Sequence, residues 1–204
     1  MSVAVIDYGA GNLRSAARAL TAAGAADVRV TGDPAEVARA ARIVLPGVGA
    51  FGHCIGALRS VPGMVAALED AVRGRGVPFL GICVGMQLLA DTGHEHGVHQ
   101  GLGWIGGSVR RMAPDGLKVP QIGWNQIVPT AEDGDGWVAP GWGYFVHSYA
   151  FLPTDPADIA ASADYGGLFP AALRRGNIFG VQFHPEKSQR YGLALLSRWL
   201  VRSD

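Results

Sequence analysis

Short apolar runs alternate with segments of helical periodicity along the first half of the chain. Strands are predicted at residues 3–7, 27–31, 42–45 and 78–82, and helices at 12–23, 34–40, 63–74 and 84–90, with Asn12 as the cap of the first helix. The strands are apolar at every position, which is typical of a parallel sheet covered on both faces. Such open α/β sheets bind ligands at the carboxyl ends of their strands.

The second half of the chain is richer in strands. They are predicted at residues 105–112, 122–128, 143–149, 159–163, 171–175 and 178–183, and a helix at 188–201. The Gly-rich polar stretches 91–103 and 130–141 are predicted to be loops. No repeat or linker divides the chain, so we expect an α/β fold in a single domain spanning residues 1–204.

Composition narrows the range of functions. Of 204 residues, 49% are hydrophobic and 17% are charged, and the formal net charge is zero, which indicates a compact globular protein. Without a basic run, neither nucleic acid nor a membrane is expected as a partner. The N-terminus lacks a secretory pattern, so a cytoplasmic location is expected. His94, His96 and His99 lack acidic or cysteine partners at metal-ligand spacing and are interpreted as solvated loop residues.

Cys83 is the first candidate for chemistry. It lies in Gly-Ile-Cys-Val-Gly (81–85), between an apolar strand and a predicted helix, which is the pattern of a nucleophile elbow. The turn would project the sulfur above the sheet, near a helix N-terminus that favours thiolate. The alternative is an inert buried cysteine in a Gly-rich turn. Cys54 is interpreted as structural.

His184 and Glu186 could complete a catalytic site. A nucleophilic cysteine needs a base, and the base needs a group that orients it. His184 follows the last predicted strand, and in an extended segment Glu186 points the same way. A chance acidic neighbour of a strand-end histidine is the alternative. An oxyanion site is expected from the Val84 N–H and from Pro-Gly-Val-Gly (46–49), although that segment could also be an ordinary turn.

Taken together, three motifs resemble the class I, or triad, glutamine amidotransferases: PGVG (46–49), GICVGMQ (81–87) and QFHPEKS (182–188). Within this family, further segments resemble the glutaminase subunits of imidazole glycerol phosphate synthases. These segments are DYGAGNL (7–13), PGVGAFG (46–52), GMQLL (85–89), GWN (123–125), YFVHSY (144–149) and HPEKSQ (184–189). The resemblance implies a flavodoxin-like three-layer fold, with a central, mostly parallel sheet and added antiparallel strands.

The resemblance also implies a reaction. Cys83, His184 and Glu186 would form the triad that hydrolyses glutamine to glutamate and ammonia, without a metal or organic cofactor. Ammonia would pass to a (β/α)₈-barrel cyclase subunit that makes imidazole glycerol phosphate and aminoimidazole carboxamide ribotide in histidine biosynthesis. The remaining matched positions are the oxyanion residues Gly47, Val48, Gly49 and Val84, the glutamine contacts Gln87, Ser148 and Tyr149, and the partner contacts Tyr8, Asn12, Gln121, Trp124, Asn125 and Lys187.

The sequence departs from the family pattern at three places and leaves alternatives open. Val84 stands where leucine is usual, His53-Cys54 follows PGVGAFG, and the loop 91–100 carries three histidines. The elbow and His-Pro-Glu are shared with the glutaminases of anthranilate, aminodeoxychorismate and pyridoxal phosphate synthases. A non-catalytic α/β redox or binding module with an elbow cysteine is the rival from a different class.

Overall fold

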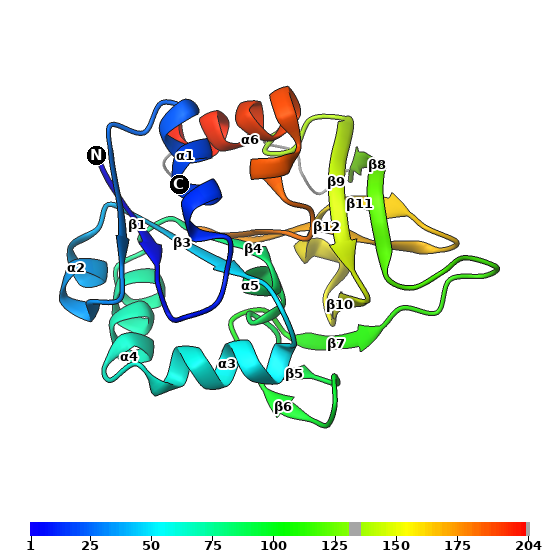
Figure 1. Cartoon of the computed structure of the whole chain (residues 1–204), viewed down its shortest axis with the longest axis horizontal. Coiled ribbons are helices and arrows are strands. Elements are labelled where there is room, and N and C mark those ends of the chain that lie inside the picture. The colour runs from blue at the N-terminus through cyan, green and yellow to red at the C-terminus, as the bar shows by residue number, and fades with distance from the viewer. Residues whose placement is uncertain (131–135, 203–204) are drawn as a thin grey trace.

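The computed structural model describes residues 1–130 and 136–202. Within these ranges, the largest sheet has nine strands in the order β2-β1-β3-β4-β13-β12-β11-β8-β9. Its first five strands run parallel and form the centre of the molecule (Figure 1). They are β2 (Asp27–Thr31), β1 (Ser2–Ile6), β3 (Arg42–Gly47), β4 (Phe79–Cys83) and β13 (Ile178–Val181).

Antiparallel strands extend this sheet on the side of β13. They are β12 (Leu168–Arg175), β11 (Ile159–Asp164), β8 (Gln121–Pro129) and β9 (Gly141–His147). A smaller sheet consists of β10 (Tyr149–Pro153), β7 (Gly107–Arg111), β5 (Thr92–Gly93) and β6 (His99–Gln100). The predicted α/β fold, with mostly parallel core strands and added antiparallel strands, is therefore confirmed.

Helices cover both faces of the parallel strands, which gives three layers. On one face, α1 (Leu13–Ala22) lies beside α6 (Gln189–Val201) (Figure 1). On the other face lie α3 (Phe51–Ser60) and α4 (Met64–Leu68), and α4 continues into the π-helical turn η1 (Glu69–Gly74). The short elements are α2 (Pro34–Arg39), α5 (Val84–Gln87), η2 (Pro156–Asp158) and η3 (Pro185–Lys187).

In the described part of the chain, no single helix is long and apolar enough to cross a membrane. By length and composition, α3 and the α4–η1 helix meet the criterion for a membrane-spanning segment only when they are taken as a pair. This pair is bent by 93° at the break between the two helices.

Several boundaries differ from the prediction. The loop predicted at 91–103 contains β5 and β6, and the strand predicted at 143–149 divides at Ser148 into β9 and β10. The helix predicted at 84–90 is the single turn α5. Part of the loop predicted at 130–141 falls at 131–135, outside the described residues. Asn12 precedes α1, but its side chain makes no capping hydrogen bond, so that prediction is wrong.

Helix α3 was not predicted. Its buried residues, Phe51, Cys54, Ile55 and Leu58, recur at the spacing of one helical face. Gly52 and Gly56 interrupt this pattern with the residue that is least favourable in a helix after proline. Burial of the apolar face against the sheet therefore outweighs the low intrinsic propensity of the segment.

The contact between α5 and β3 requires glycine. A Cβ atom at Gly85 would lie 1.8 Å from the carbonyl oxygen of Leu45, which belongs to the backbone and has little room to move. Because Gly85 follows the elbow, this close contact brings Cys83 to the end of β3. The second glycine of the elbow motif therefore has a packing reason.

We expect Gly85→Ala to lower the free energy of unfolding by about 3 kcal/mol or more, because the added methyl group collides with backbone. Gly56→Ala is the matched control, since no atom lies within 4 Å of a Cβ built there. In a helix it should be neutral or stabilise by up to about 1 kcal/mol. Urea denaturation of both variants checks the difference, and equal stabilities would contradict the packing argument.

Candidate active site

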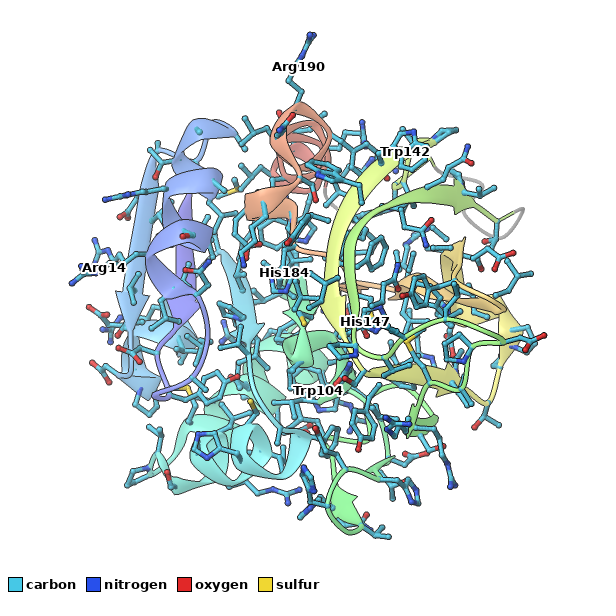
Figure 2. All side chains as sticks on the ribbon, turned by 45° about the vertical axis from the view of Figure 1, so that its right-hand side comes forward. Arg14, Trp104, Trp142, His147, His184 and Arg190 are labelled. Carbon is cyan, nitrogen blue, oxygen red and sulfur yellow. The ribbon has the colours of Figure 1, made fainter. Side chains whose placement is uncertain are left out.

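A cavity of 280 Å³ opens at the carboxyl ends of β3 and β4, as expected for an open α/β sheet. Both halves of the chain line it, and Figure 2 places His184 and His147 at the centre of the molecule, where the halves meet. The lining residues are Val48, Gly49, Cys83, Val84, Gln87, Glu95, Pro120, Val146, His147, Ser148, Tyr149, His184 and Lys187.

Cys83 ends β4 in the backbone conformation expected of an elbow. Its φ of 56° and ψ of −114° lie where residues other than glycine are strained. The side chain is almost fully buried, and its sulfur lies 4.0 Å from the carbonyl oxygen of Val146 and 3.6 Å from Nε2 of Gln182. Because α5 has only four residues, its N-terminal charge favours thiolate less than a long helix would.

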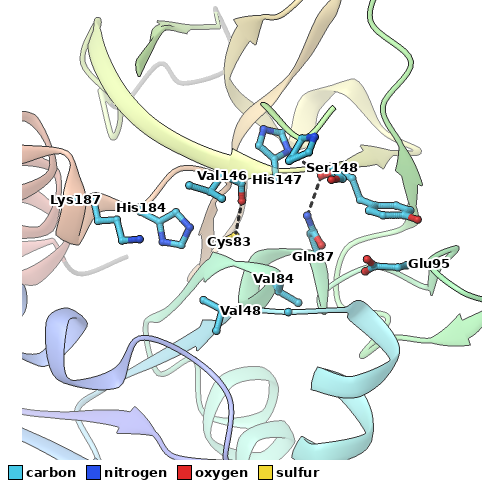
Figure 3. A pocket seen from close by; sticks show the side chains of 13 residues that line it. Val48, Cys83, Val84, Gln87, Glu95, Val146, His147, Ser148, His184 and Lys187 are labelled. Atoms are coloured by element: carbon cyan, nitrogen blue, oxygen red, sulfur yellow. Dashed lines mark hydrogen bonds between the residues drawn. The ribbon is translucent and has the colours of Figure 1, made fainter. Parts of the chain in front are cut away.

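His184 lies beside the thiol, with Glu186 behind it. Figure 3 shows the His184 ring between Lys187 and Cys83, and the ring Nδ1 lies 2.8 Å from Oε1 of Glu186. Both side chains are buried. Burial alone would lower the pKa of His184, but its hydrogen bonds with Cys83 and Glu186 outweigh burial and raise the pKa to about 10. The arrangement therefore favours the protonated imidazole at His184.

Ser188 holds the backbone of the histidine. Its hydroxyl donates to the carbonyl oxygen of His184 at 2.7 Å and accepts from the Tyr144 N–H at 2.9 Å. The His184 N–H in turn donates to the carbonyl oxygen of Tyr144 at 2.9 Å. These contacts fix the segment after β13 against β9.

The predicted oxyanion segment Gly47–Gly49 lies at the end of β3, and its Val48 and Gly49 line the same cavity as His184. Gly47 pairs in register with Cys83, and a Cβ on Gly47 would lie 2.6 Å from the Gly85 nitrogen. Gly49 has a φ of 102°, which favours glycine. Val48 is exposed at the cavity, and the helix α5 begins with Val84. The close approach leaves no room for a side chain at Gly47.

Tyr8 and Cys54 hold this segment from beneath. The Tyr8 hydroxyl donates to the carbonyl oxygen of Pro46 at 2.8 Å, and the Cys54 thiol donates to that of Val48 at 3.3 Å. Burial raises the pKa of both groups, so both stay protonated and remain donors. Tyr8 is only 5% exposed, and its contact with a partner subunit stays a prediction.

Gln87, Ser148 and Tyr149, the predicted glutamine contacts, all line the cavity. Gln87 is buried, and its Nε2 donates to the carbonyl oxygen of Tyr149 at 3.0 Å and to Oε1 of Gln182 at 2.9 Å. The amide nitrogen is therefore engaged within the protein, where it ties α5 to β10.

The family model for class-I glutamine amidotransferases matches residues 4–202. The chain belongs to the class-I glutamine amidotransferase family. An imidazole glycerol phosphate synthase subunit HisH from Zymomonas mobilis is 59% identical over 203 residues, covering 98% of this chain and 95% of the relative. The subunit of the same name from Rhodospirillum rubrum is 52% identical over 210 residues, covering 98% of both chains.

Solved structures show the same fold at much lower sequence identity. A crystal structure described as glutamine amidotransferase superposes with a TM-score of 0.76 at 20% identity, covering 98% of this chain and 99% of the other. The three-layer architecture is therefore that of other amidotransferases.

Two cavity residues of this amidotransferase were not predicted. Glu95 lies in the loop after the elbow, where its Oε2 accepts a hydrogen bond from the Phe51 N–H at 2.8 Å. The only sign of Glu95 in the sequence was an acidic residue among the three histidines of that loop. Nothing in the sequence indicates that it lies at the same cavity as Cys83. His147 belongs to the YFVHSY motif, and its alternation with buried neighbours was the only sign of its burial.

Gln121 is the partner of His147. His147 Nε2 lies 3.0 Å from Gln121 Oε1, and Gln121 is only 3% exposed. Within this chain the Gln121 side chain is engaged by His147, and its contact with a partner subunit stays a prediction. Burial lowers the pKa of His147 to about 4, against the hydrogen bond with the Tyr149 carbonyl oxygen at 2.9 Å.

The other predicted partner contacts differ in exposure. Trp124 is 45% exposed and packs edge-to-face on Tyr144, with ring centroids 5.9 Å apart. The exposed Lys187 places its Nζ 5.9 Å from the centroid of the same tyrosine ring. Asn125 donates to the Asp164 carbonyl oxygen at 2.7 Å, and Asn12 is partly exposed before α1. Trp124, Tyr144 and Lys187 thus form one group beside the cavity.

His147 should make stability fall at acidic pH. Its unfolded pKa is about 6.5 and its folded pKa is lower, so between these values the unfolded state binds a proton that the folded state excludes. Stability is therefore lost as pH falls from 6.5 toward 4, by up to about 1.4 kcal/mol per pH unit.

Urea denaturation at pH 7 and pH 5 checks this for the unmodified chain and for His147→Gln, which should depend less on pH. His53→Gln, an exposed position on α3, is the control and should retain the original pH dependence. An unchanged pH dependence in His147→Gln would contradict a neutral buried imidazole.

Proposed function

We propose that this chain, as a single domain, is the glutaminase subunit of an imidazole glycerol phosphate synthase in the cytoplasm. It hydrolyses glutamine to glutamate and ammonia, and the ammonia is used by a partner subunit in histidine biosynthesis. The observation that carries the proposal is the alignment of Cys83, His184 and Glu186 at one cavity, with the His184–Glu186 contact at 2.8 Å. The names of relatives at 59% and 52% identity support the choice of synthase.

The first half-reaction begins with the Cys83 thiolate. Its sulfur forms a bond to the carboxamide carbon of glutamine, and the carbonyl oxygen becomes an oxyanion. The N–H of Val84 and an N–H from the Gly47–Gly49 segment stabilise that charge. His184, held protonated by Glu186 and the thiolate, gives its proton to the leaving nitrogen as the C–N bond breaks. Ammonia and a γ-glutamyl thioester result.

The second half-reaction hydrolyses the thioester. The now neutral His184 takes a proton from water, and the water oxygen attacks the thioester carbon. The C–S bond breaks, glutamate leaves, and the sulfur departs as thiolate beside the protonated histidine. Glu186 keeps the imidazole in the orientation that both proton transfers need. The chemistry uses no metal ion or organic cofactor.

Glutamine is positioned by the far wall of the cavity. Its α-ammonium group pairs with the Glu95 carboxylate, which is held by the Phe51 N–H at 2.8 Å. Ser148 and Tyr149 face the α-carboxylate end, and Gln87 fixes that wall through its contact with the Tyr149 carbonyl oxygen at 3.0 Å. The reacting carboxamide then reaches Cys83.

The partner, a (β/α)₈-barrel cyclase subunit, docks on the outer face of the β8–β9 hairpin. Residues opposite each other in this antiparallel pair point to the same face, so Trp124 lies beside Tyr144 and Gln126 beside Trp142. Ile122, Trp124 and Trp142 on this face are 62%, 45% and 56% exposed. Aromatic side chains of this kind are typical anchors of protein interfaces. The face borders the cavity through Lys187 and Val146.

Two rival functions are less well supported. The glutaminase of another synthase would share the elbow and the His-Pro-Glu segment. The relatives cited above, however, are named as subunits of imidazole glycerol phosphate synthase, and the matches cover nearly their whole length. A non-catalytic module would have no use for a buried His184–Glu186 pair.

Cys83→Ala should lower glutamine-dependent synthesis by the complex at least about 10³-fold, because the nucleophile is lost. Synthesis from added ammonium salt should remain, since the cyclase reaction occurs in the partner. Steady-state assays of the reconstituted complex with each nitrogen source measure both. Equal loss of the two activities would contradict the proposed division of labour.

Trp124→Ala should raise the Kd for the cyclase subunit about tenfold or more, because it removes an exposed aromatic anchor. Val201→Ala, at an exposed apolar position on α6, is the matched control and should leave the Kd unchanged. Isothermal titration calorimetry gives both values. Identical affinities for the two variants would place the partner on another surface.

A further inference from the structure

Gln182 contacts the proposed nucleophile, and no role follows for it from the triad. Its side chain is completely buried, and its Nε2 donates to the Cys83 sulfur at 3.6 Å. This separation is that of a hydrogen bond to sulfur, whose atomic radius exceeds that of oxygen. The residue directly follows β13, so the pairing of β13 with β4 fixes its distance from the elbow.

The direction of the Gln182 amide is determined by its neighbours. The carbonyl oxygen of Tyr149 can only accept a hydrogen bond, so Gln87 must present its amide nitrogen there, at 3.0 Å. The same nitrogen donates its second proton to Oε1 of Gln182 at 2.9 Å. Gln182 is thereby left with its NH₂ group toward the sulfur (Figure 3 shows Gln87 and Cys83 in this cavity). The Tyr149 carbonyl oxygen thus determines the donor-to-acceptor direction of the hydrogen bonds that link Gln87, Gln182 and the Cys83 sulfur.

We propose that Gln182 is a further catalytic residue, whose side-chain amide stabilises the thiolate of Cys83 by a hydrogen bond. The inference rests on the proposed function, in which Cys83 is the nucleophile. A thiolate is a stronger acceptor than a thiol or a thioester sulfur, so the bond is strongest before attack on glutamine and when the sulfur leaves. The amide therefore assists the departure of the sulfur in the second half-reaction as well as the formation of the nucleophile.

Several ionisable groups surround the same sulfur or share its cavity. They are His184 and Lys187 from the segment after β13, Tyr8 and Cys54 beneath β3, His147 on β9, and Glu95 in the loop after α5. Gln182 differs from all of them because it is a neutral donor. Its contribution does not vanish when any of these groups titrates, so its effect can be measured across the whole pH range.

The test is the rate of alkylation of Cys83 by iodoacetamide as a function of pH, in the full-length chain. Gln182→Glu keeps the shape and replaces the donor by an acceptor, and Gln182→Met keeps the length and removes the donor. We expect the midpoint of the alkylation profile to move up by about one pH unit or more in both. Cys83→Ser supplies the background from Cys54, and circular dichroism reports whether each variant is folded.

Gln87→Leu is a second, independent variant. It removes the group that sets the direction of the Gln182 amide, so the midpoint should move in the same direction by a smaller amount. In the unmodified protein, the side-chain amide resonance of Gln182 should shift as Cys83 loses its proton and return when the thiol is alkylated. This measurement requires no variant and decides the question if the substitutions prevent folding.

Folded Gln182 variants with the original alkylation profile would overturn the proposal, as would an amide resonance that is insensitive to alkylation. Failure of the proposed function has a different signature, since the unmodified chain would then show no Cys83-dependent hydrolysis of glutamine in the complex. The two failures are therefore distinguishable.

Discussion

The parallel pairing of β4 with β13 is the contact on which the rest of the structure depends. Each strand comes from a different half of the chain, and the register places Gly180 opposite Gly81 and Val181 opposite Ile82. Both glycines lie under α5: a Cβ at Gly81 would approach the Gly85 oxygen to 2.7 Å, and one at Gly180 the Met86 Cγ to 2.5 Å. Because α5 can lie flat on the two strands, the elbow and the segment that carries the histidine emerge side by side.

Two buried histidines in one cavity illustrate how neighbouring groups determine the charge of an imidazole. Burial disfavours the charged form of both rings. His184 has Glu186 and the Cys83 thiol as neighbours, and its pKa is raised to about 10. His147 has a backbone carbonyl and an amide instead, and its pKa is lowered to about 4. The cavity therefore holds one cationic and one neutral imidazole at neutral pH, and only the first faces the thiol.

The sequence predicted those parts of the site that depend on local pattern. The elbow around Cys83 and the His184–Glu186 pair are each defined by neighbours in sequence, and the structure places both at one cavity. Family motifs do not report burial: Tyr8 and Gln121 are buried, and their hydrogen-bond partners, Pro46 and His147, lie 38 and 26 residues away. Glu95 contacts Phe51 across 44 residues and Gln182 contacts Cys83 across 99, and α3 was hidden by its glycines. Contacts of this kind depend on the tertiary fold.

The order of the strands along the chain has a consequence for synthesis. The thiol emerges from the ribosome with the first four parallel strands, whereas its base follows β13 after the whole antiparallel half has been made. A nascent or truncated chain that stops before β13 carries Cys83 without His184, Glu186 and Gln182, because all three follow that strand. Under the proposed mechanism, the thioester therefore cannot form until the last parallel strand has been made.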